Sequence, residues 1–208
     1  MATSKTALTF VFALMCGPVL AGPDAPLDRL RTAHALYTIG LDQKQPLYIL
    51  AAAKLRKSIA LKRTGRAPAG GATASGAPLS WQDMLAAAAP LSQGDPMLVG
   101  LAEDIAAEGT KGVASGPVYS VVTIGAGASD KYPHLTFSGG QYAEIYVEGA
   151  SGTDLNLLVH DARGRLVCSD TDISAIAYCG WHPATDGSFA ITVKNDGKRG
   201  GKYSMMTN

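Results

Sequence analysis

Residues 139–167, GGQYAEIYVEGASGTDLNLLVHDARGRLV, decide the fold of this chain. Apolar side chains recur at every second position in two runs, residues 143–147 and 155–159, which is the period of a β-strand with one buried face. Turn-forming residues bound these runs at 149–152 and 161–164. Short alternating runs separated by turns predict antiparallel strands of a β-sandwich.

The same two-residue period continues on both sides of this stretch. Residues 118–124 are rich in strand-forming side chains, and residues 189–194 alternate apolar and polar positions up to a turn at 195–197. A glycine-rich segment, residues 109–117, separates this region from what precedes it. We therefore expect an antiparallel, jelly-roll-like β-sandwich over residues 117–208.

Before residue 108 the apolar side chains follow a helical period instead. Leu47, Ala51 and Leu55 recur at four-residue steps, which places them on one face of a helix. Pro46 stands where a first helical residue tolerates a missing N–H. The alanine-rich region 22–108 is therefore predicted to be helical, and the whole chain to be α+β in two parts.

We expect two helical hairpins in this region, because the order helix, turn, proline, helix occurs over residues 35–61 and again over 86–107. The two halves are either distantly related repeats or unrelated amphipathic helices that share turn chemistry. Between them, residues 64–79 are rich in glycine, proline and small side chains. Such a composition buries little apolar surface, so a flexible linker is predicted there.

The first 21 residues have the features of a secretory signal peptide. Lys5 precedes an apolar run, and Ala21 supplies the small residue that signal peptidase requires. The chain has 18 Lys and Arg residues against 17 Asp and Glu, and Lys5 is the single charged residue of this segment. Cleavage would leave a chain of balanced charge, which argues against nucleic acid as a partner. We expect a periplasmic or secreted protein without a stable membrane span.

Cysteine usage agrees with export. Loss of residues 1–21 removes Cys16 and leaves Cys168 and Cys179. A pair of cysteines in an exported chain predicts a disulfide bond, with two free buried thiols as the alternative.

Residues 137–208, within the predicted sandwich of residues 117–208, resemble the bacterial pre-peptidase C-terminal domain, a secreted β-sandwich. The elements that carry the resemblance are the glycine pair 139–140 before a strand, the run 153–157, the turn 161–164 and the closing element 187–195. Asn156 stands where the family has a second acidic residue, and Phe189 where tyrosine is usual. The resemblance implies a role in secretion, surface attachment or ligand binding.

One strand face is a candidate binding surface. It carries Tyr142, Tyr146, Glu144 and Glu148, and exposed tyrosines beside carboxylates suit a polysaccharide or a protein partner. The same face could instead be covered by the helical region, in which case it would bind no external ligand.

A second candidate is a weak calcium site. Asp170 and Asp172 place oxygen ligands at alternate positions inside the predicted disulfide loop, and Asp154 could approach them across the strands. The alternative is a polar loop in which aspartates make turn hydrogen bonds. Apart from calcium, we expect no cofactor.

The sequence contains neither His-Glu-x-x-His nor Gly-x-Ser-x-Gly, and we predict no catalytic residues. Our hypothesis is a non-catalytic exported protein of the bacterial cell envelope, whose sandwich contacts a polymer or a protein partner. A secretion or stability accessory, in which the sandwich supports folding of the helical part, is the first alternative. An uncharacterised hydrolase is the second.

Overall fold

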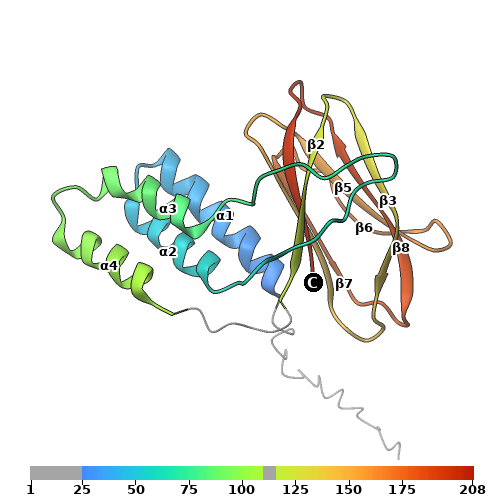
Figure 1. Cartoon of the computed structure of the whole chain (residues 1–208), viewed down its shortest axis with the longest axis horizontal. Helices are drawn as coiled ribbons and strands as arrows, with labels where there is room; N and C mark the ends of the chain where they lie inside the picture. The colour runs from blue at the N-terminus through green and yellow to red at the C-terminus, as the bar shows by residue number, and fades with distance from the viewer. Residues whose placement is uncertain (1–24, 110–115) are drawn as a thin grey trace, which may run out of the picture.

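The computed structural model describes residues 25–109 and 116–208 and divides them between a helical part and a β-sandwich (Figure 1). The helices lie against one side of the sandwich. The predicted α+β organisation, with helices first and an antiparallel sandwich after them, is confirmed. The predicted signal peptide, residues 1–21, lies outside the described residues.

The helical part is built around one central helix. Its elements are α1 (Pro26–Asp42), α2 (Pro46–Lys57), α3 (Trp81–Ala88), the short 3-10 turn η1 (Ala89–Leu91) and α4 (Pro96–Ala107). The α2 helix packs against α1, α3 and α4. Prolines occupy the first position of α1, α2 and α4, and Ser80 and Asp83 form a reciprocal capping box at the start of α3. The shared core is small, since much of it is alanine.

The sandwich consists of two sheets. Sheet A has the strand order β1 (Lys62–Arg63), β2 (Val118–Ile124), β9 (Gly201–Thr207), β4 (Ala143–Gly149) and β7 (Ile176–Trp181). Sheet B has the order β3 (Ser129–Phe137), β8 (Gly187–Asn195), β5 (Leu155–Asp161) and β6 (Leu166–Asp170). Neighbouring strands are antiparallel except β1 and β2, which are parallel.

The core lies between the sheets, at the positions that the two-residue period predicts. Ile145 and Val147 of β4, together with the alternating apolar residues of β5, are fully buried there. Cys168 of β6 and Cys179 of β7 form the predicted disulfide, with their Cα atoms 5.9 Å apart. Because β6 belongs to sheet B and β7 to sheet A, this bond joins the two sheets along one edge of the sandwich.

Residues 64–79, predicted to be a flexible linker, are instead attached to the sandwich. The backbone N–H groups of Ala69 and Ala74 donate to carbonyls of β3 and β2, each at 2.7 Å. Figure 1 shows the segment, which we call the strap, crossing the sandwich and returning to the helices. The prediction is wrong because composition measures only the apolar surface that side chains can bury, whereas backbone groups pair with an open sheet edge whatever the side chain.

Candidate functional site

Three of the four residues in the predicted tyrosine–glutamate surface are buried beneath the helices. Tyr146, Glu144 and Glu148 belong to β4, and the helical part covers them. Leu27 and Leu30 of α1 pack with Tyr146 in one apolar cluster. The prediction of an exposed binding surface is therefore wrong, and the alternative of a covered face holds. The physical reason is that the carboxylates find partners on the helices and can be buried with them.

Glu148 is the anchor of this covered face. Arg56 of α2 forms a bidentate ion pair with Glu148, with Nη1 2.7 Å from Oε2 and Nη2 3.1 Å from Oε1. The Tyr146 hydroxyl and the backbone N–H of Leu79 also donate to it, each at 3.1 Å, and His34 Nδ1 lies 3.7 Å from Oε2. Burial alone would raise the pKa of Glu148, but His34 and Arg56 together lower it to about 2. The charged carboxylate thus fastens α2 and the end of the strap to sheet A.

Glu144 fastens α1 in a different way. Its Oε1 accepts the backbone N–H of Asp28 at 3.0 Å, and Oε2 accepts that of Leu27 at 3.4 Å. These are unsatisfied donors of the first turn of α1, so a carboxylate of the sheet caps a helix that lacks a side-chain cap of its own. The Tyr178 hydroxyl donates to Oε1 as well, at 2.9 Å. Burial raises the pKa of Glu144, and these hydrogen bonds oppose that shift.

Tyr142, the fourth residue of the predicted surface, is half-buried at the margin of the covered face. Its hydroxyl lies 3.2 Å from that of Tyr178, and its ring centroid lies 4.9 Å from that of His182. It lines a hollow of about 260 Å³ together with Asn208. Tyr142 therefore does not form one surface with Tyr146.

Two of the three aspartates of the calcium hypothesis accept backbone hydrogen bonds through their carboxylates. Asp170 Oδ2 accepts the backbone N–H of Tyr178 at 2.8 Å, and its Oδ1 accepts that of Asp172 at 3.4 Å. Asp154 Oδ1 accepts the N–H of Ser174 at 3.3 Å. Over residues 25–109 and 116–208, no cluster of three or more His, Cys, Asp or Glu side chains could hold a metal ion. The bond from Asp172 to Asp170 is a turn hydrogen bond of the alternative interpretation, whereas the bond from Ser174 brings Asp154 to the disulfide loop.

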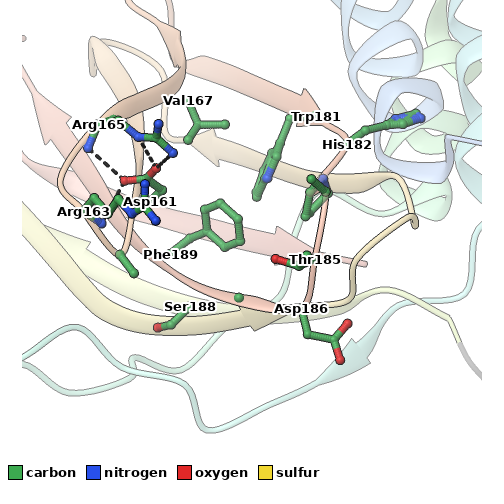
Figure 2. Close-up of a pocket in the computed structure, with 14 residues that line it drawn as sticks. Asp161, Arg163, Arg165, Val167, Trp181, His182, Thr185, Asp186, Ser188 and Phe189 are labelled. Atoms are coloured by element: carbon green, nitrogen blue, oxygen red, sulfur yellow. Dashed lines mark hydrogen bonds and ion pairs between the residues drawn. The ribbon is translucent and has the colours of Figure 1, made fainter.

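A groove lies elsewhere, at the open end of the sandwich (Figure 2). This groove has a volume of about 450 Å³, within the usual range for small-ligand sites. One wall is the β5–β6 hairpin, residues 161–165, and the other is the β7–β8 connection, residues 182–186. Neither α1 nor α2 contributes a lining residue.

Aromatic side chains from both sheets form the floor of the groove. Trp181 ends β7 in sheet A and Phe189 lies in β8 of sheet B, with ring centroids 5.2 Å apart and planes at 61°. Phe137 stands behind them, 4.9 Å from Trp181. Val167 of β6 completes the apolar lining, and it is partly exposed. Since these rings belong to the main core cluster, the groove opens directly onto the core between the sheets.

Two arginines of the β5–β6 hairpin have contrasting surroundings. Arg165 folds back on Asp161, with Nε 2.7 Å and Nη2 2.6 Å from Oδ2 (Figure 2). Asp161 also accepts the backbone N–H groups of Arg163 and Arg165, each at 2.9 Å, and Gly164 turns the chain at a φ of 76°. The guanidinium of Arg163 is exposed and has no hydrogen-bond or ion-pair partner in the described part of the chain.

The opposite wall is fixed by the turn between β3 and β4. Asp186 Oδ1 accepts the backbone N–H of Gly139 at 2.7 Å, and the N–H of Gly140 donates to the carbonyl of Pro183 at 2.8 Å. A Cβ atom on Gly139 would lie 2.5 Å from Thr185 Cα, so only glycine allows this approach. The groove is therefore preformed, with both walls held by internal hydrogen bonds.

The arrangement is suited to binding. The His182 ring packs at a tilt of 54° against the Tyr142 ring, and among the described residues no hydrogen bond joins His182 to Ser188 or Asp186, which line the same groove. The groove therefore combines an apolar floor with separate polar groups on its rim, as small-ligand sites do.

Sequence reasoning did not find this groove. It treated Arg163 only as part of the turn 161–164. The walls and floor come from two separated segments, residues 161–167 and 181–189, that meet only in the folded sandwich. The available signal was an arginine-rich hairpin turn in a chain with few aromatic residues, and it is not specific.

No family model matches the sequence, and no curated protein matches it either. Among solved structures, the chain is similar to the pre-peptidase C-terminal domain of collagenase from Bacillus anthracis, with 15% identity over 43% of this chain and 87% of that chain and a TM-score of 0.36. It is also similar to PliG, a periplasmic inhibitor of g-type lysozyme from Aeromonas hydrophila, with 13% identity over 49% and 90% of the two chains and a TM-score of 0.32. The C-terminal CBM6 of LamC from Zobellia galactanivorans matches with 10% identity over 43% and 79% and a TM-score of 0.28. The resemblance to the pre-peptidase C-terminal domain thus recurs among the structural matches, at a level that concerns the type of fold alone.

Proposed function

We propose that this chain is a non-catalytic, exported binding protein of the cell envelope, and that the groove at the open end of the sandwich is its ligand site. The observation that supports this most strongly is the unfilled groove itself. Trp181 and Phe189 of the core lie at its floor, and the exposed guanidinium of Arg163 stands unpaired on its rim. A folded protein seldom leaves both features together at one place unless something binds there.

The helical part has a supporting role in this proposal. It occupies the outer face of sheet A through the buried Arg56–Glu148 pair and the capping of α1 by Glu144. This arrangement also favours a second candidate function, in which the sandwich acts as a folding support for the helices. The two functions differ in their prediction for the groove, because a folding support needs no ligand there.

The disulfide between Cys168 and Cys179 supports the exported location, because such bonds persist in oxidising compartments. None of the helices in the described residues is long and apolar enough to cross a membrane.

Retention on purified cell-envelope material tests the proposal. Val167→Arg places a long charged side chain at the mouth of the groove, where Val167 is partly exposed. The matched control is Ile173→Arg, since Ile173 is 93% exposed and does not line the groove. We expect the unmodified protein and the control to be retained and Val167→Arg to be released. Equal retention of all three proteins would show that the groove is not the ligand site. No retention of any of them would favour the folding-support function.

A further inference from the structure

The floor of the groove is a slot and not a platform. Trp181 is 8% exposed and Phe189 is 7% exposed, and the rings of Trp181, Phe189 and Phe137 meet edge to face. A sugar ring that stacks on an aromatic residue needs a broad exposed ring face, which these side chains do not offer. A single apolar side chain placed between the two walls would instead cover these ring edges and lose its own contact with water.

The unpaired charged group of the groove is a donor. The Arg163 guanidinium is exposed and has no partner in the described part of the chain. A guanidinium cannot accept a hydrogen bond, so a ligand group that pairs with it must supply acceptor atoms. A carboxylate matches a guanidinium best, because two parallel N–H···O bonds can form.

The charges around the groove favour one carboxylate over a polyanion. Arg165 is already paired with Asp161, and Asp186 contributes a second negative charge on the opposite wall. Among the described residues that line the groove, Arg163 is the arginine left to neutralise an incoming anion. A chain with many negative charges would therefore meet repulsion from Asp186 without further cations to offset it.

We propose that the groove binds the C-terminal end of a peptide partner, with a large apolar last side chain in the slot and its α-carboxylate on Arg163. This inference rests on the proposed function and names its ligand. The last residue of a peptide carries both an apolar side chain, which would enter the slot, and an α-carboxylate, which would pair with the Arg163 guanidinium.

The two tryptophans allow a direct test. Trp181 lies in the groove and Trp81 at the start of α3, so the indole N–H signals of the full chain include a reporter and an internal control. We would titrate the ¹⁵N-labelled protein with acetyl-Gly-Gly-Leu-Phe carrying a free C-terminus, and with the same peptide as its C-terminal amide. We expect the free acid to shift the Trp181 signal saturably and leave Trp81 unmoved, and the amide to bind about tenfold more weakly.

Two variants complete the test. Arg163→Gln should abolish the preference for the acid, whereas Lys198→Gln, an exposed cation away from the groove, should preserve it. Equal affinity for acid and amide in the unmodified protein would overturn the inference. A Trp181 shift with galacturonate but with neither peptide would overturn it in favour of an acidic sugar. If Val167→Arg still abolished envelope retention in either case, the proposed function would stand and only the ligand class would fall.

Discussion

The outer face of sheet A and the open end of the sandwich use the same types of side chain with opposite results. On sheet A, Arg56 is 3% exposed and paired with Glu148 beneath α2. At the open end, Arg163 is exposed and unpaired in the described part of the chain, on the rim of the groove that Trp181 also lines. The difference teaches that the partners of a charged side chain, and not its type, distinguish an internal interface from a surface available to a ligand.

Breaking the ion pair of the covered face should lower the free energy of unfolding more than any other change considered. Arg56→Ala leaves the Glu148 carboxylate buried without its cation, and we expect the free energy of unfolding to fall by roughly 3–5 kcal/mol. Urea unfolding of the full chain measures this. The double variant Arg56→Met with Glu148→Leu removes both charges and should recover most of the loss. A loss below about 1 kcal/mol in Arg56→Ala would mean that the pair does not hold the helices.

The same face should make stability depend on acid pH. The pKa of Glu148 is lowered to about 2 in the folded protein, so its contribution is present above its ordinary pKa of 4.5 and is lost as pH falls from 4.5 towards 2. The loss is on the order of 3 kcal/mol, and the raised pKa of Glu144 opposes it, because a protonated Glu144 is favoured in the fold. Unfolding free energies measured across this range check the slope. Glu148→Gln should flatten it, and an unchanged slope in that variant would contradict the assignment.

The disulfide connects the comparison to the groove. Replacing Cys168 and Cys179 with alanine should lower the free energy of unfolding by about 3 kcal/mol, because the bond closes a loop of 11 residues between the two sheets. Cys168 directly follows Val167, and Cys179 lies two residues before Trp181, so we also expect weaker peptide binding. Titration under native conditions separates the two effects. Full peptide affinity in the variant would show that the groove walls do not depend on the bond.

The open end should give the smallest effect on stability. Arg163→Gln removes an unpaired, exposed cation, and the free energy of unfolding should change by less than about 0.5 kcal/mol. Set beside Arg56→Gln, measured in the same urea experiment, it compares one substitution in two environments. Equal losses of unfolding free energy in the two variants would contradict the distinction between a paired arginine on the covered face and an unpaired one in the groove.

Local pattern predicted those parts of the fold that local chemistry decides. The strands of 143–149 and 155–161 follow from alternation, and the start of α3 follows from Ser80 and Asp83. The strap differs because backbone hydrogen bonds to β2 and β3 attach it, and these leave no trace in side-chain composition.

The candidate site was less predictable. Alternation placed Tyr146 and Glu148 together on one strand, but it cannot say which layer covers that strand, and the helices do. The groove depends on tertiary structure even more, because Arg163, Trp181 and Phe189 are separate in the sequence and meet only where the two sheets part. The resemblance to a secreted sandwich family covered the turn 161–164 and Phe189, but it gave no indication that they meet in a groove.

Hydroxyl-radical footprinting of the full chain, with and without solubilised envelope extract, would show whether the ligand binds in the groove. It reports on the groove and on the exposed apolar residues of the helices, such as Tyr48 and Met97, in one experiment. We expect the extract to protect Val167 and His182 from oxidation and to leave the oxidation of Tyr48 and Met97 unchanged. Protection of the helical residues, with the groove unchanged, would contradict it and place the binding surface on the helical part.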